Sequence, residues 1–226
     1  VDSEHFSILK LIENTKLDQI YTSIALLTLV ILILNFNFIL IYSLIILGVI
    51  SIIEFLNISK KIFKYSLSKI FYNSLFIIYI FIFCFLFFFF SNISGLKIIL
   101  FILLFGCIAS DIGGFIFGKL IKGPKLTKIS PNKTYSGALG SIFFSVITIS
   151  TLFSFYLQNF NYKIILISLI TTIFCQLGDL MFSFLKRKAK IKDTGGLLPG
   201  HGGVLDRLDG IFLGLPFGFL SLILLN

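Results

Sequence analysis

Apolar runs of about twenty residues follow one another through most of this 226-residue chain. A run of that length is what an α-helix needs to cross the hydrocarbon core of a bilayer. A helix also satisfies every backbone N–H and C=O group within its own segment, as the bilayer requires. Only 13% of the residues are charged, against roughly a quarter in soluble domains. The sequence therefore predicts an all-α fold, a polytopic integral membrane helix bundle.

About seven transmembrane helices are expected. The first apolar run, residues 20–56, is too long for one span, and Asn35 and Asn37 interrupt it, which predicts a tight hairpin of two rather short helices. Five further spans are expected at about 71–90, 98–117, 138–157, 164–185 and 204–225. Residues 1–19 are polar and mixed in charge, without a convincing cleavable signal. We expect them to form a leader before a single transmembrane domain, residues 20–226.

The loops alternate in charge. Those after the second, fourth and sixth expected spans carry four, five and five Lys or Arg residues, and the intervening loops carry none, one and one. By the positive-inside rule, the N-terminus and the three basic loops are cytosolic, as in a multi-pass protein of a bacterial-type inner (cell) membrane. The net charge of +9 thus lies beside membrane spans. This placement favours anionic lipid headgroups and a soluble phosphate compound as partners, and no nucleic acid.

The segment Ser183–Gly210 concentrates the polar chemistry of the chain. Lysine and arginine donors bind phosphate oxygens, and glycines allow backbone N–H groups to close around an anion. Carboxylates three residues apart on a helix share a face and can hold a hard cation such as Mg²⁺. The segment contains a basic run, one acid, a Gly/Pro-rich turn, a histidine and two more acids: Lys186, Arg187, Lys188, Lys190, Lys192, Asp193, His201, Asp206 and Asp209.

Several roles are open for the acids and the histidine. Asp206 and Asp209 could be metal ligands, or they could cap the start of the last helix. His201 could donate a proton, contact a phosphate or support the loop. Asp111 lies late in the fourth expected span and could be functional or a structural acid, with Gly114 and Gly118 on the same face for close helix contact.

Asp179 shares a helical face with Ser183, Lys186 and Arg187. This face runs from an acid in the membrane to cations at its cytosolic end, which would suit a cation that bridges to a phosphate. A salt-bridged helix end is the alternative.

The pattern S-x-L-K-R-x4-K-D-x-G-x2-L-P-G-H-G-G-V-x-D-R-x-D, from Ser183 to Asp209, resembles the signature of the phosphatidate cytidylyltransferases, or CDP-diacylglycerol synthases. Two upstream segments are similar to that family as well, S-D-x-G-G-F-x-F-G-K from Ser110 and I-S-P-N-K-T-Y-S-G from Ile129. Glu54-Phe55 resembles an acidic–aromatic pair of the family, for which we favour a structural role. The similarity covers roughly Glu54–Leu225.

The chain departs from the family pattern at two positions. Ser136 and Phe182 stand where many relatives have Glu. No carboxylate role is therefore carried over to either position.

The resemblance implies transfer of a cytidylyl group from CTP to phosphatidate, with Mg²⁺ and a second cation as an option. The oligomeric state is open, a homodimer among the alternatives. We assign metal binding to Asp111, Asp179, Asp206 and Asp209, and catalysis to Asp206, Asp209, Arg207, His201, Lys186 and Arg187. The expected substrate-binding residues are Ser130, Asn132, Lys133, Thr134, Lys192, Asp193, Gly202 and Gly203.

Two other functions compete with this interpretation. A CTP-dependent lipid kinase of the polyprenol type would need a base for a hydroxyl, for which only His201 or an aspartate could serve. A transporter would place a polar site at the membrane midplane, often between repeated halves. Here the charges lie at the cytosolic ends of the spans, and no repeat is evident.

Overall fold

The computed structural model describes residues 21, 24, 25, 27–127, 130, 133–159, 161–197 and 202–225, with the backbone alone for Ser94. The predicted leader, residues 1–19, and two predicted site residues, Asn132 and His201, lie outside the described residues. The secondary structure of the described part is mainly helical, and Lys125 and Thr134 form an isolated antiparallel bridge.

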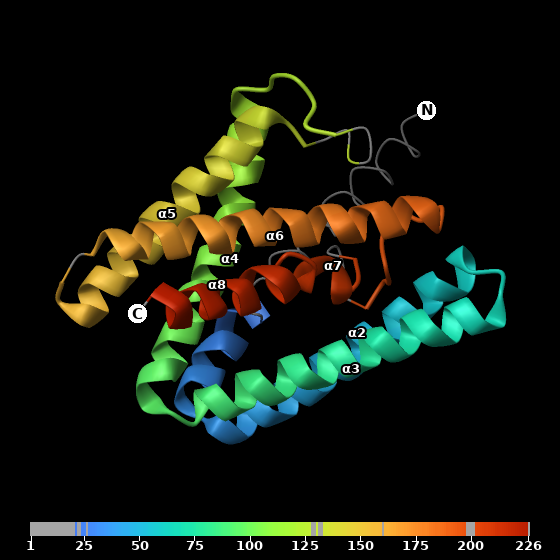
Figure 1. Cartoon of the computed structure of the whole chain (residues 1–226), viewed down its shortest axis with the longest axis horizontal. Helices are drawn as coiled ribbons and strands as arrows, with labels where there is room; N and C mark the ends of the chain where they lie inside the picture. Colours follow the sequence, from blue (N-terminus) through green and yellow to red (C-terminus); the bar gives the residue numbers. More distant parts are fainter. Residues whose placement is uncertain are drawn as a thin grey trace, which may run out of the picture. The chain divides into compact units, whose positions relative to one another are not determined.

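Six helical segments in the described ranges are long and apolar enough to cross a membrane. This finding confirms the prediction of a polytopic membrane helix bundle. They are α2 (Asn37–Ile62), α3 (Ser66–Ser91), α4 (Ser94–Leu120), α5 (Tyr135–Leu157), α6 (Tyr162–Lys188) and the segment Leu205–Leu225, which comprises α7 (Leu205–Leu208) and α8 (Ile211–Leu225) (Figure 1).

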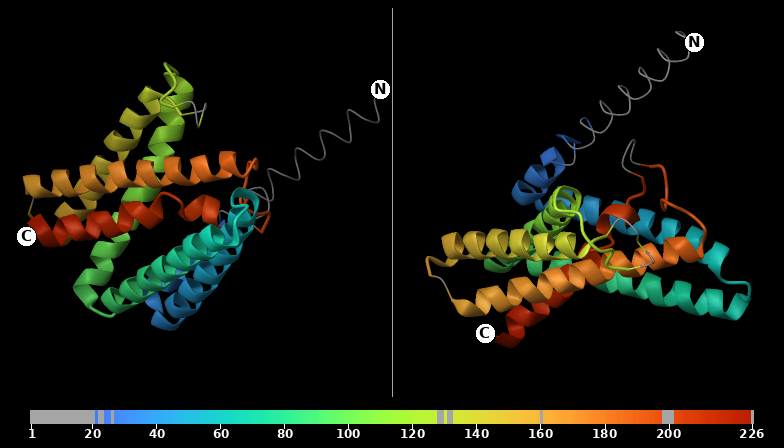
Figure 2. Two further views of the ribbon diagram at one scale, coloured as in Figure 1. Left: turned by 45° about the vertical axis from the view of Figure 1, so that its right-hand side comes forward. Right: turned by 90° about the horizontal axis from the view of Figure 1, so that it is seen from above.

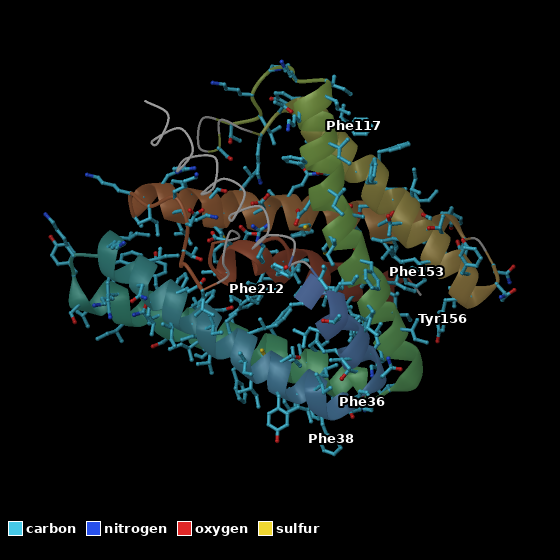
Figure 3. The ribbon with its side chains drawn as sticks, turned by 180° about the vertical axis from the view of Figure 1, so that it is seen from behind. Phe36, Phe38, Phe117, Phe153, Tyr156 and Phe212 are labelled. Atoms are coloured by element: carbon cyan, nitrogen blue, oxygen red, sulfur yellow. The ribbon has the colours of Figure 1, made fainter. Side chains whose placement is uncertain are left out.

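The first expected span is described in part, and its described residues up to 35 (21, 24, 25 and 27–35) are helical. The predicted interruption lies at Phe36, whose extended backbone (φ −125°, ψ 110°) separates that segment from α2. Figure 3 labels Phe36 and Phe38 at this bend. The second helix is longer than predicted, because α2 runs on to Ile62 and takes Lys60 and Lys61 into its last turn. Cations are favourable there, since the carboxyl end of a helix carries partial negative charge.

The chain divides into two compact units, which are described separately. Unit 1 contains the residues up to Ile80 together with Lys192–Asp206, and unit 2 contains Phe81–Ile191 and Arg207–Asn226. The assignment of residues 20–226 to one domain stays a prediction.

In unit 1, α2 and the first part of α3 lie side by side (Figure 2). Their contact is aromatic: Phe55 stacks on Phe76 with ring centroids 3.9 Å apart, and Phe63 stacks on Tyr72 at 4.6 Å. Stacked rings of this kind add to the energy of burying their area.

In unit 2, small residues bring α4 and α5 into close contact. A Cβ at Gly113 would collide with the carbonyl oxygen of Gly140, and one at Gly114 would lie 2.6 Å from Oγ of Ser141. Gly140 in turn faces Phe117, which Figure 3 labels on α4. The predicted close helix contact through Gly114 is therefore confirmed.

Glycines also join α6 to α8. A Cβ at Gly214 would lie 2.9 Å from Cβ of Cys175, and one at Gly218 would collide with the hydroxyl of Thr171. Gly178 of α6 faces the backbone of Asp209 and Gly210 in the turn before α8. Because there is no side chain at Gly178, this turn can pack directly against α6. That contact places Asp209 beside the polar face of α6.

Candidate functional site

The first polar contact in unit 2 joins a loop to a spanning helix. Lys133 lies two residues before α5, and its ammonium group forms an ion pair with Oδ2 of Asp179 on α6. Both side chains are about one quarter to one third exposed, at 26% and 30%. The expected substrate-binding lysine and the expected metal ligand are thus in direct contact. The sequence suggested each residue separately but did not suggest the pair.

A second contact joins α6 to the turn before α8. Nζ of Lys186 lies 3.7 Å from Oδ2 of Asp209, and both side chains are nearly buried. Oδ1 of Asp209 accepts a hydrogen bond of 2.9 Å from the backbone N–H of Gly210. Lys186 is two turns along α6 from Asp179, so the two ion pairs follow one face of the helix, as the sequence predicted for this face.

Asp111 on α4 belongs to the same group of charges. The charges of Asp179, Lys133 and Arg207 all act on its carboxylate, and those of Asp179, Lys186 and Asp111 act on Asp209. Three carboxylates from separate elements therefore share their surroundings with three cations. Charges inside or beside membrane spans are costly and are usually functional. We name the group the charged cluster: Asp111, Lys133, Asp179, Lys186, Arg207 and Asp209.

The charged cluster fits one part of the expected Mg²⁺ site. Carboxylate oxygens are the ligands that Mg²⁺ prefers, and it often uses only one or two of them together with water and substrate phosphates. In the described ranges, no three histidine, cysteine, aspartate or glutamate side chains converge closely enough to form a metal site by themselves. Asp179 and Asp209 are the acids best placed for such a partial ligand set, since each faces a lysine of the cluster and the charge of Asp179 acts on Asp209. Metal binding by Asp111, Asp179, Asp206 and Asp209 stays a prediction.

Asp206 belongs to unit 1, where it is bound to the segment that precedes it. Its Oδ2 atom accepts hydrogen bonds from the backbone N–H of Thr194 (2.8 Å), the hydroxyl of Thr194 (3.0 Å) and the backbone N–H of Gly203 (3.0 Å). The last contact, with an N–H three residues earlier, has the direction of the backward contact in a capping box. Helix α7 ends at Leu208, so Asp209 lies beyond it, and the two acids do not share one helix start as expected.

Glu54 also belongs to unit 1, and its contacts were not predicted from the sequence. Its side chain, 5% exposed, reaches from α2 to the segment around Thr194 and Val204 in unit 1. A signal was available, because an acid at the end of an apolar span needs partners when it is buried. Neither the identity of those partners nor the role of Thr194 was predictable from the sequence.

Two glycines just before α7, Gly202 and Gly203, stand at positions where a side chain would be unfavourable. Gly202 has a φ of +82°, a backbone conformation that residues with a Cβ rarely adopt. A Cβ at Gly203 would lie 2.5 Å from Oε2 of Glu54 and would collide with the hydroxyl of Thr194. Gly203 thus allows a close approach between the segment and α2.

The loop before α5 is closed by hydrogen bonds. The hydroxyl of Thr134 caps α5 by accepting from the N–H of Gly137 at 3.1 Å, and it exchanges a hydrogen bond of 2.9 Å with Ser136. Ser136 also donates to the carbonyl of Lys122. The N–H of Lys133 donates to the carbonyl of Ser130 at 3.0 Å. Ser136 therefore has a loop-closing contact in this structure.

The remaining predicted positions do not join one constellation. Phe182 is 2% exposed and packs near the ring of Phe212, which explains how an apolar side chain is accommodated there. Three predicted site residues outside the charged cluster are exposed: Arg187, Lys192 and Asp193. Their assigned roles stay predictions.

Comparison with known proteins adds a family. A sequence model described as the cytidylyltransferase family matches residues 3–225. A protein of Rickettsia bellii named phosphatidate cytidylyltransferase is 43% identical over 128 residues, which cover 52% of this chain and 55% of that protein. A protein of Staphylococcus aureus with the same name is 45% identical over 109 residues, 47% of this chain and 42% of that protein. The matched region thus spans about half the length of these curated relatives.

Proposed function

Because the chain belongs to the cytidylyltransferase family, we propose that it transfers the cytidylyl group of CTP to phosphatidate, giving CDP-diacylglycerol and pyrophosphate. The observation that carries the proposal is the family match, which extends over nearly all of the chain, from residue 3 to residue 225. The names of the relatives supply the lipid acceptor. The charged cluster supports the proposal, since it places cations and carboxylates from several helices of a membrane protein together.

The proposed reaction does not need a strong general base. A phosphate oxygen of the lipid attacks the α-phosphorus of CTP, the new P–O bond forms, and pyrophosphate leaves with the electron pair of the broken bond. The attacking phosphate is already an anion near neutral pH. Two polyanions must be brought together and oriented, so cationic groups should supply most of the catalysis.

Lys133 and Lys186 are suited to this task because both can exchange partners. In the structure each lysine faces a carboxylate, Asp179 or Asp209. A phosphate that enters the cluster would compete for the ammonium groups, and charge-assisted hydrogen bonds to phosphate are strong. The carboxylates released in this way would be available for Mg²⁺. When bound by Asp179 and Asp209, Mg²⁺ would neutralise charge on the triphosphate.

We place the reaction at the cytosolic face of a bacterial inner membrane. The support is the alternation of loop charges, which puts the basic segments before α3, before α5 and after α6 on one side. Anionic lipids are expected partners of those segments. The acyl chains of phosphatidate would stay in the bilayer while its headgroup meets CTP at the interface.

Two labelled forms of CTP test the proposal. The purified protein in lipid nanodiscs that contain phosphatidate is supplied with CTP labelled at the α-phosphorus or, separately, at the γ-phosphorus. Cytidylyl transfer labels the lipid product from the α form only, and the γ label leaves as pyrophosphate. A lipid kinase gives the opposite pattern, with label from the γ form on an added polyprenol. Lys188→Ala is the matched active control, because this exposed lysine lies outside the charged cluster.

A further inference from the structure

Glu54 connects α2 to a segment 140 to 151 residues later in the chain. Its Oε2 atom accepts hydrogen bonds from the hydroxyl of Thr194 (2.6 Å) and the N–H of Leu205 (2.9 Å), and its Oε1 atom accepts one from the N–H of Val204 (3.0 Å). All these groups belong to unit 1. One buried side chain thus joins both described ends of the glycine-rich segment, 194–195 and 203–205.

Thr194 extends this contact to Asp206. A hydroxyl has one hydrogen to donate, and at 2.6 Å Glu54 is the nearer of the two acceptors that face it. The N–H of Thr194 and the N–H of Gly203 donate to Oδ2 of Asp206. Glu54 therefore fixes the two stretches of backbone whose N–H groups hold the Asp206 carboxylate.

The close fit supports a specific role for this arrangement. At Gly195 a Cβ would lie 2.6 Å from Oε1 of Glu54, and at Gly203 a Cβ would lie 2.5 Å from its Oε2. Two glycines at separate positions of the segment thus leave the space that the carboxylate occupies. A substitution that only filled the space would not provide the three acceptor contacts.

We propose that Glu54 is the positioning residue for Asp206: it holds Thr194 and the backbone of residues 203–205 so that their N–H groups orient the Asp206 carboxylate. The catalytic meaning of this role rests on the proposed function and on the catalytic role that the sequence predicts for Asp206. The positioning itself is a property of the fold and has its own measurement.

Hydrogen exchange at four backbone amides tests the positioning. The N–H groups of Val204 and Leu205 bind Glu54, whereas those of Thr194 and Gly203 bind Asp206. In Glu54→Gln an NH₂ group replaces one of the two carboxylate oxygens. At least one backbone N–H group that has an acceptor in the wild-type protein then faces a donor. We expect all four amides to exchange at least tenfold faster, measured by mass spectrometry with single-amide resolution.

Two further variants establish the direction of the effect. Asp206→Ala should accelerate exchange at Thr194 and Gly203 tenfold and leave Val204 within threefold of wild type. Ser51→Ala is the matched control, since Ser51 is fully buried one turn earlier on α2 and its hydroxyl donates to the carbonyl of Leu47 within the same helix. It should leave the four amides within twofold of wild type.

If Glu54→Gln does not fold, Thr194→Val replaces it as the milder change. It removes the hydroxyl and keeps the shape, so exchange at Gly203 should rise severalfold, and Thr194→Ser should restore the wild-type rate. Unchanged exchange at Thr194 and Gly203 in a folded Glu54→Gln protein, with faster exchange at Val204 and Leu205, would overturn the proposal. Glu54 would then anchor the segment without orienting Asp206.

Activity gives an independent comparison. In the assay with α-labelled CTP, Glu54→Gln should lower kcat at least tenfold and leave KM for phosphatidate within twofold, since Glu54 is not expected to touch the lipid. Wild-type kcat in Glu54→Gln would overturn the catalytic part of the proposal. No cytidylyl product from the wild-type protein, with the expected exchange pattern, would instead reject the proposed function and leave the positioning established.

Discussion

A single methyl group at Gly203 should be far more damaging than the same methyl group at Gly196. A Cβ at Gly203 would collide with the hydroxyl of Thr194 and lie 2.5 Å from Glu54 and 2.7 Å from the N–H nitrogen of Gly195. Nothing lies within 4 Å of a Cβ at Gly196, which is exposed. The two glycines are seven residues apart, so Gly203→Ala and Gly196→Ala form a matched pair.

The cost at Gly203 has two parts. Forcing an extra methyl group into a packed site costs about 1–3 kcal/mol. The displaced contact between Thr194 and Glu54 leaves a buried carboxylate without one of its donors, which costs about another 1–3 kcal/mol. The expected loss of unfolding free energy is therefore about 2–6 kcal/mol. At Gly196 the change is expected to be neutral, or stabilising by up to about 1 kcal/mol through the unfolded chain.

Thermal unfolding of the purified variants in identical nanodiscs measures the difference. For a chain of this length each kcal/mol corresponds to about 2–4 °C in Tm. Gly203→Ala should thus unfold at least about 4 °C below wild type, and Gly196→Ala within about 3 °C of wild type or above it. Equal Tm values for the two variants would refute the reasoning, because the close approach to Glu54 would then have no energetic consequence.

Three further outcomes are expected. Asp209→Asn should lower turnover about a hundredfold or more while the protein still folds, because the charge that faces Lys186 and the expected Mg²⁺ is lost; turnover within threefold of wild type at limiting Mg²⁺ would contradict this role. Lys190→Gly should raise Tm, since Lys190 has a φ of +55° at the end of α6 and relief of that conformation is worth about 1 kcal/mol; a lower Tm would contradict it. Gly140→Val should reduce the monodisperse yield severalfold by separating α5 from Phe117 of α4, whereas the control Leu139→Val at an exposed position should not; equal yields would show that the contact is dispensable.

The helical membrane architecture was predictable because its signal is local. Each span is a run of apolar residues, and the interruption near Asn35 and Asn37 was visible as polar side chains within such a run. Helix ends were less predictable. Helix α6 ends in the hydrogen bonds from the N–H of Lys190 to the carbonyl of Arg187 and from the N–H of Ile191 to the carbonyl of Lys186, with a lysine where glycine is the usual residue.

The residues of the charged cluster were predictable from the sequence, but the ion pairs between them were predictable only in part. The spacing of Asp179 and Lys186 along one helix indicated a shared face, because helical geometry repeats every 3.6 residues. The pairing of Asp179 with Lys133, 46 residues away, has no counterpart in local spacing. The same is true of Asp209 and Lys186, whose contact depends on the packing of the turn before α8 against Gly178.

The sequence by itself determined that the chain is a membrane helix bundle with its charged and glycine-rich segments confined to a few loops and helix ends. Local hydropathy and residue type carry that information. The tertiary structure decided which charges are partners, and that Glu54 on α2 holds Thr194, Val204 and Leu205. The physical reason is that such contacts depend on how closely helices approach each other. Glycines such as Gly178 and Gly203 allow this close approach because they have no side chain. The sequence shows the glycines, but only the packed fold shows which groups lie against them.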